Sequence, residues 1–244
     1  MPVETLIPIC AAILIVAFLY SSVGHAGASG YIAVMTLFGL VPTVVKPAAL
    51  VLNILVACLA TWQFRQAGHF SWKLFWPFAI SSVPFAFLGG YLNLPTQVFK
   101  ILIGLVLLYS AARFLIRPKP DEEPHSPTKP VSISVGAGLG LLSGLTGVGG
   151  GIFLTPLVIL MRWARTKTAS AVSALFILAN SISGLLGNMT STRQLPFFAL
   201  PLAIAAILGG SVGSYLGSRQ FSSLSIKRLL GIVLTIAGFK LLFT

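Results

Sequence analysis

The sequence predicts an all-α integral membrane protein with about eight transmembrane helical segments in two repeats. Three observations lead to this prediction. Of the 244 residues, 56% are hydrophobic and 8% are charged, whereas a soluble domain carries roughly 25% charged residues. Several apolar stretches reach about 18 residues, enough to cross a bilayer. A glycine-rich motif occurs once in each half of the chain, which indicates an internal duplication of the kind found in transporters.

The first predicted repeat, residues 1–116, opens with an interrupted apolar segment. Leu6–Tyr20 is followed by the glycine-rich stretch Ser21–Gly30 and then by a shorter run, Tyr31–Val45. Glycine weakens a helix by about 1 kcal/mol relative to alanine, so several in one stretch should open the segment into two helices. Three continuous segments follow, at Pro47–Phe64, Leu74–Leu92 and Val98–Ile116.

A polar, proline-rich linker, residues 117–130, separates the repeats and holds every acidic residue except Glu4. We expect it to act as a flexible hinge. The second repeat, residues 131–244, follows the same plan, and its motif Gly144–Gly150 aligns with Gly24–Gly30. Its predicted parts are Val131–Gly144, the glycine-rich Leu145–Gly151, the short run Ile152–Met161, and the segments Ala169–Gly187, Phe197–Gly217 and Leu229–Phe243.

The positive charges favour an inverted relation between the repeats. If each interrupted segment is a hairpin that enters and leaves the membrane on one side, 12 of the 16 Lys and Arg residues share one side. If each interrupted segment crosses the membrane, the charges divide equally and give no orientation. The hairpin arrangement therefore predicts inverted repeats, with the linker in the cytoplasm and both termini outside.

The charged residues also limit the function. The net charge is +12, but the basic residues are scattered among short loops, which is typical of topology signals beside a lipid bilayer and not of nucleic-acid binding. None of the four acidic residues lies in an apolar segment, so a small anionic or neutral substrate is favoured over a cation. Cys10 and Cys58 form no metal or redox motif, and we expect neither a metal nor a cofactor.

The two glycine-rich stretches form the candidate substrate site. A helix that restarts after a break presents unpaired N–H groups and the positive end of its dipole, which suits an anion. In the inverted arrangement the two breaks would meet near the middle of the bilayer, where transporters with repeats hold substrate. The expected substrate-binding residues are Gly24, His25, Gly27, Ser29, Gly30, Thr146, Gly147, Gly149, Gly150, Gly151, Asn180 and Ser181.

Purely structural roles compete with this interpretation. His25 is the one histidine in an apolar region, and it can bind an anion or simply hydrogen-bond a neighbouring backbone. Asn180 can bond an adjacent helix instead of lining a pathway, and Asn53 is the weaker candidate of the two. The pairs Gly89–Gly90 and Gly209–Gly210 are interpreted as positions of close helix packing only.

The two interrupted segments also resemble a known family. GHAGASGYIAVMTLFGL, beginning at Gly24, and GLTGVGGGIFLTPLVIL, beginning at Gly144, resemble the paired signature of the sulfite exporter TauE/SafE family, also called TSUP. The resemblance covers nearly the whole chain. It implies a transporter in the bacterial or archaeal inner membrane whose substrate is a sulfur-containing anion, such as sulfite or an organosulfonate. The residues by themselves indicate only a transporter of an anion.

Other functions stay open on the sequence alone. An anion channel needs the same water-filled path as a carrier. Gly27–Gly30 has the GxSG form of an intramembrane serine protease, but no histidine follows Ser29 in an apolar segment to serve as its base, so we expect no enzyme. A scaffold without transport activity would tolerate bulky residues at the glycine breaks. A homo-oligomer is compatible with each of these functions.

Overall fold

The computed structural model describes residues 3–92, 97–116, 118, 120–192 and 200–243, and every regular element in this part of the chain is helical. The first half contains α1 (Val3–Ser22), α2 (Ala28–Leu37), α3 (Pro42–Gln66), α4 (Trp72–Tyr91) and α5 (Gln97–Ile116). The second half contains α6 (Lys129–Thr146), α7 (Gly151–Leu160), α8 (Thr166–Thr192), α9 (Leu200–Tyr215) with its π-helical extension η2 (Leu216–Gln220), and α10 (Ser223–Phe243). The predicted all-α class is therefore confirmed.

Five of these helices are long and apolar enough to cross a bilayer, within the described residues. The candidate spans are Thr5–Ser22, Val44–Gln66, Trp72–Tyr91, Thr166–Thr192 and Pro201–Gln220. The prediction of an integral membrane protein is confirmed, although five spans are fewer than the eight expected. Helices α2 and α7 have ten residues each, or about 15 Å, roughly half the thickness of a hydrocarbon core. Residues 197–199 of a predicted segment, and the charges of Arg117, Lys119 and Arg193, lie outside the described residues.

Both short helices follow a break bounded by two glycines with left-handed backbone. Gly24 and Gly27 have φ angles of 80° and 105°, and Gly147 and Gly150 have 73° and 78°. An L-residue with a side chain rarely adopts this conformation, which explains the glycines. The equivalent glycines are 123 residues apart. The sequence motif aligned Gly24 with Gly144, but the backbone conformation pairs Gly24 with Gly147.

Two parallel helix pairs join the first half to the second. In both pairs, glycines one turn apart bring the backbones so close that an added Cβ would lie 2.0–2.4 Å from a carbonyl oxygen of the partner helix. Gly136, Gly140 and Gly144 of α6 face the carbonyls of Phe78, Ser82 and Ala86 of α4. Gly209, Gly213 and Gly217 of α9 and η2 face those of Leu14, Phe18 and Ser22 of α1. The close-packing interpretation of Gly89–Gly90 and Gly209–Gly210 agrees with their contacts, which include backbone oxygens of α6, α8 and α1.

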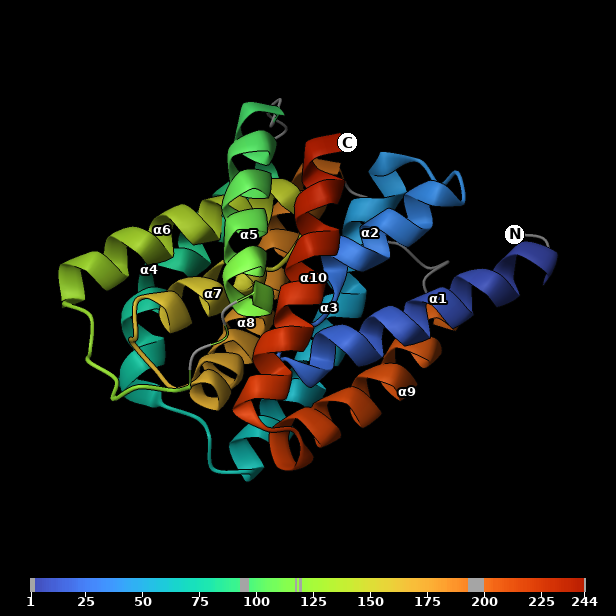
Figure 1. Cartoon of the computed structure of the whole chain (residues 1–244). Helices are drawn as coiled ribbons and strands as arrows, with labels where there is room; N and C mark the ends of the chain where they lie inside the picture. The colour runs from blue at the N-terminus through green and yellow to red at the C-terminus, as the bar shows by residue number, and fades with distance from the viewer. Residues whose placement is uncertain (1–2, 93–96, 117, 119, 193–199, 244) are drawn as a thin grey trace.

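The last helices of the two halves form an antiparallel pair. Figure 1 shows α5 in green and α10 in red, side by side and running in opposite directions. The contacts agree, because Gly104 meets Gly238 whereas Ala111, further along α5, meets Gly231, earlier on α10. The long helices α3 and α8 pack against each other. Helix α3 also packs against α9, and α8 also packs against α4. Equivalent helices that run in opposite directions are what an inverted duplication predicts.

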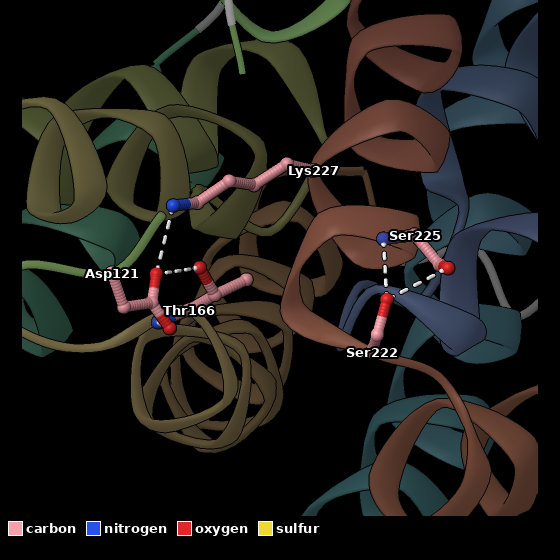
Figure 2. Close-up of polar contacts among 5 residues, drawn as sticks. All are labelled: Asp121, Thr166, Ser222, Ser225 and Lys227. Carbon is pink, nitrogen blue, oxygen red and sulfur yellow. Dashed lines mark hydrogen bonds and ion pairs between the residues drawn. The ribbon is translucent and has the colours of Figure 1, made fainter. Parts of the chain in front are cut away.

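The linker is bonded to the helix ends around it. Asp121 forms a 2.8 Å ion pair with Lys227 of α10 and accepts hydrogen bonds from the hydroxyl (2.6 Å) and the N–H (3.2 Å) of Thr166, the first residue of α8 (Figure 2). The same figure shows Ser222 accepting from the N–H of Ser225 at the start of α10. Glu122 also forms an ion pair with Arg162, at 2.6 Å.

These contacts change the electrostatics of Asp121. Burial raises the pKa of its carboxyl, but the hydrogen bonds from Lys227 and Thr166 outweigh burial and hold the pKa below its ordinary value of 3.8. Since Lys227 is only 5% exposed, this ion pair is largely removed from water. Asp121 and Glu122 therefore connect the linker to α10, to the start of α8 and to the loop that precedes α8. That the linker acts as a flexible hinge stays a prediction.

Candidate substrate site at the two helix breaks

The first break is held by contacts to α3 and α8. Gly24 lies against α8, where an added Cβ would be 2.5 Å from the carbonyl oxygen of Ser170. Helix α2 restarts at Ala28, three residues before the predicted restart, so Ser29 and Gly30 belong to the helix and not to the break. The N–H of Ala28 donates to the side-chain oxygen of Asn53 at 2.9 Å, which satisfies one of the free donors of α2.

The second break packs against the same neighbours. Gly149 lies between two polar side chains, since an added Cβ would be 2.7 Å from Asn53 Nδ2 and 2.8 Å from Ser181 Oγ. Gly150 immediately precedes α7 and faces the ring of Phe176, 2.9 Å from an added Cβ. Gly150 has no side chain with which to cap α7, and among the described residues no side chain accepts from the N–H groups at the start of this helix as Asn53 does in α2. The N-terminal donors of α7 therefore differ from those of α2, where Asn53 binds the first N–H.

Buried polar contacts bring the two breaks together. His25, in the first break, makes a 2.7 Å hydrogen bond from its Nε2 to the hydroxyl of Thr155 in α7. Asn53 accepts from Ala28, donates to Ser181 Oγ at 3.3 Å, and contacts Gly149. The side chains of His25 and Asn53 are almost fully buried, at 2% and 0% exposure. The breaks therefore lie beside each other inside the helix bundle.

A small cavity of about 10 Å³ lies between the breaks. Its wall comes from both of them and from the adjoining helices: Tyr20, His25, Ala26, Gly27, Ala28, Ser29, Val148, Ile152 and Ile177. This volume is at the lower limit for one water molecule, which is about 10–15 Å³. A polyatomic anion can enter only after the surrounding helices separate, so this conformation is closed.

Several predicted site residues have other tasks. The hydroxyl of Thr146 donates to the carbonyl of Leu142 one turn earlier in α6, at 2.6 Å, and so is bound to its own helix. Gly30 and Gly151 allow close packing, because an added Cβ would lie 2.5 Å from Val16 and 2.4 Å from Ile177, respectively. Ser29 shares a 2.9 Å hydrogen bond with the hydroxyl of Tyr20.

Helix α8 leaves several buried polar atoms without partners. Asn180 is 0% exposed, and neither its amide nitrogen nor its amide oxygen has a hydrogen-bond partner among the described residues. The same holds for the hydroxyls of Ser170 and Ser173 and for the side-chain oxygen of Asn188, as well as for the Nδ1 atom of His25 in the first break. An unsatisfied buried polar group costs about 1–3 kcal/mol, so these atoms need water or a ligand.

Sequence reasoning underrated two central residues. Asn53 ranked below Asn180, although it contacts both breaks, and its position as an amide in the middle of an apolar segment was the available signal. Thr155 was missed altogether, because it lies in the run Ile152–Met161 and nothing in the sequence marks it as the partner of His25.

A bundle of apolar helices with two interrupted helices at its centre places the chain in the class of polytopic integral membrane proteins with discontinuous helices. The family model described as "Sulfite exporter TauE/SafE" matches residues 9–241. The chain belongs to this family of membrane transporters.

Its curated relatives are described as transporters without a stated substrate. The chain is 39% identical over 237 residues to "Probable membrane transporter protein y4hK" of Sinorhizobium fredii, covering 95% of this chain and 96% of the relative. It is 27% identical over 210 residues to "Probable membrane transporter protein YunE" of Bacillus subtilis, covering 78% and 76%. A probable membrane transporter protein of Methanocaldococcus jannaschii is 28% identical over 194 residues, covering 74% and 71%. No solved structure gives a significant match.

Proposed function

We propose that the protein transports a sulfur-containing anion, such as sulfite or an organosulfonate, across the inner membrane of a bacterium or archaeon. The observation that carries this proposal is the meeting of the two helix breaks around buried polar side chains, above all His25 and Asn53. The description of the matched family as sulfite exporters supports the substrate class.

In this proposal the anion binds where the breaks meet, near the middle of the bilayer. The start of α7 is the better half of the site, because no side chain occupies its N-terminal donors whereas Asn53 occupies that of α2. His25, Ser181 and the unpartnered amide of Asn180 supply further polar atoms. The side chain of Lys46 also reaches the second break, with Cγ 2.9 Å from a Cβ added at Gly147, and brings a positive charge towards it.

The transport cycle we propose is alternating access between two inverted repeats, residues 1–116 and 131–244. The antiparallel contact of α5 and α10, and the recurrence of a ten-residue helix after each break, support this relation. The linker then faces the cytoplasm and both termini lie outside. The unpartnered polar atoms of Ser170, Ser173 and Asn188 support a water-filled path along α8.

The closed cavity favours a carrier over a channel, because a space of about 10 Å³ offers no continuous path for an anion. The protease alternative has little support. The hydroxyl of Ser29 is bonded to Tyr20, and the imidazole of His25 is bonded to Thr155, so no base lies on Ser29.

Efflux of radiolabelled sulfite from liposomes tests the proposal, with and without an imposed membrane potential. We expect saturable efflux from wild-type protein, and efflux at the level of empty liposomes for Gly27→Val and Gly150→Val. Valine is strained at a left-handed φ by about 1–3 kcal/mol and would press on the Tyr31 and Phe176 rings, respectively.

Gly138→Val is the matched control, because no atom of the other described helices lies within 4 Å of a Cβ at this glycine of α6. It should keep wild-type efflux. Unchanged flux in both break variants would reject the site, whereas folded wild-type protein without sulfite flux would reject sulfite and direct the same assay to larger organosulfonates.

A further inference from the structure

A second cavity lies away from the helix breaks, where α4, α6 and α8 begin. Its volume is about 360 Å³, and its wall includes the linker around His125 and the loop that precedes α8. Volumes of about 300–1,000 Å³ are typical of sites that bind small organic molecules. Figure 1 shows the linker and this loop approaching each other beside α4 and α6, at the lower left of the view. Nothing in the transport proposal uses this space.

Three positive charges surround this cavity. Lys73 comes from the first turn of α4, Lys129 is the first residue of α6, and Arg165 directly precedes α8. None of the three side chains forms an ion pair or a hydrogen bond within the described residues, and no Asp or Glu belongs to the wall. Asp121 and Glu122 of the linker do not compensate them, because these two are paired with Lys227 and Arg162. Glu123, the third acid of the linker, is exposed and does not belong to the wall. The cavity therefore attracts anions.

Aromatic side chains indicate the depth of this cavity in the membrane. Trp72 and Trp76 are stacked with ring centres 6.0 Å apart, remain 45% and 59% exposed, and lie in the same turns of α4 as Lys73. Exposed tryptophans collect at the level of the lipid headgroups. Other parts of the wall are apolar, including Leu74 and Trp163. A cationic rim over an apolar wall, at headgroup depth, matches an amphipathic anion better than a free inorganic ion.

We propose that this cavity binds the headgroup of an anionic phospholipid. Lys73, Lys129 and Arg165 hold the phosphate, and the wall around Leu74 and Trp163 covers the adjoining glycerol and the first acyl carbons. The bound lipid touches the linker and the starts of three helices that belong to both halves of the chain. It therefore ties the two halves together on the linker side.

Native mass spectrometry of the delipidated full-length protein tests this site with added phosphatidylglycerol, phosphatidylcholine or inorganic phosphate. We expect wild-type protein to prefer phosphatidylglycerol. The triple variant K73Q/K129Q/R165Q should bind it roughly 100-fold more weakly, because each Lys or Arg beside an anionic headgroup contributes about fivefold. The single variant Lys129→Gln should bind phosphatidylglycerol about fivefold more weakly than the wild type. It replaces the triple variant in the test if the triple variant does not fold.

The matched control is R113Q/R219Q/R228Q, which removes the same charge from exposed positions outside this cavity. It should keep the preference of the wild type. Equal affinity of the triple variant and the wild type for phosphatidylglycerol would overturn the proposal. Binding of inorganic phosphate that the triple variant loses, without any preference between the two lipids, would identify a free anion as the ligand and overturn it as well.

Discussion

Asn53 is the residue that holds the two helix breaks together. Its amide oxygen binds the first N–H of α2 while its amide nitrogen donates to Ser181 of α8, so one side chain uses both a donor and an acceptor. Aspartate would have no donor for Ser181 and would bury a charge, and leucine would leave the N–H of Ala28 without a partner. The position is therefore specific for an amide.

At the residue scale, the sequence predicted backbone shape better than side-chain partners. Gly24, Gly27, Gly147 and Gly150 were recognisable as parts of the breaks because glycine adopts a left-handed backbone more readily than any other residue. The partners of His25 and Thr146 were not, since a hydroxyl in an apolar segment bonds either its own helix or a distant one. Only the packed bundle decides that Thr155 faces His25 while Thr146 bonds Leu142.

Replacing Asp121 by asparagine should destabilise the protein at neutral pH. Lys227 would lose its charged partner while remaining buried, which costs about 3–5 kcal/mol for a fully buried pair. Because the Asp121 side chain keeps 17% exposure, we expect the free energy of unfolding to fall by about 1–3 kcal/mol. Thermal unfolding of Asp121→Asn and wild type in detergent at pH 7 measures this difference.

The same difference should vanish in acid. Because the pKa of Asp121 is lower in the folded protein than its ordinary value of 3.8, the ion pair stabilises the protein fully above that value. The stabilisation is lost as the pH falls through the folded pKa, so the melting temperatures of the two proteins should converge only below that pKa. Glu123→Gln, which alters an exposed acid of the same linker, should match wild type throughout. Equal melting temperatures of all three proteins at pH 7 would contradict the assignment.

At the element scale, the parallel pairs α4–α6 and α1–α9 are set by glycine spacing. Glycines four residues apart let backbones approach within the width of one side chain, and in a membrane such contacts replace the hydrophobic effect as the source of helix association. The sequence predicted that glycine pairs serve packing, but not which helix each would meet. The helix boundaries moved as well, since Ser29 and Gly30 were assigned to a break and lie in α2.

Alanine substitutions at two nearby glycines of α6 should change the stability of the protein in opposite directions. At Gly140 the new Cβ would lie 2.2 Å from the Ser82 carbonyl oxygen, so Gly140→Ala forces α4 and α6 apart and should cost about 1–3 kcal/mol. At Gly138 no atom from the other described helices lies within 4 Å of the added Cβ, and alanine should stabilise the helix by up to about 1 kcal/mol. Melting temperatures in detergent give both values, and equal melting temperatures would refute the packing account.

At the scale of the whole molecule, composition predicted the membrane class and the family resemblance was confirmed. The number of spans was harder to predict because apolar length does not show whether a ten-residue helix crosses, turns back or stops halfway. The direction of each helix is a tertiary property, visible only in contacts such as that of Gly104 with Gly238.

The inverted arrangement predicts which exposed positions share one side of the membrane. In a protein whose Cys10 and Cys58 are replaced by alanine, single cysteines at Ala67, Glu123 and Met161 should react with an impermeant thiol reagent only from the cytoplasmic side. Cysteines at Thr5 and Val41 should react only from outside. The last two are internal controls for membrane integrity. Reaction of positions 67 and 161 from opposite sides would exclude the inverted arrangement.

The pairing of α1 with α9 also has a consequence for biogenesis. Leu14 and its contact Gly209 are 195 residues apart, so the ribosome completes almost the whole chain before α1 meets its partner. At about 5–20 residues per second, α1 resides in the bilayer for roughly 10–40 s with its docking face open to lipid. The insertion machinery must therefore shelter a nascent first half that cannot mature until the second half has been translated.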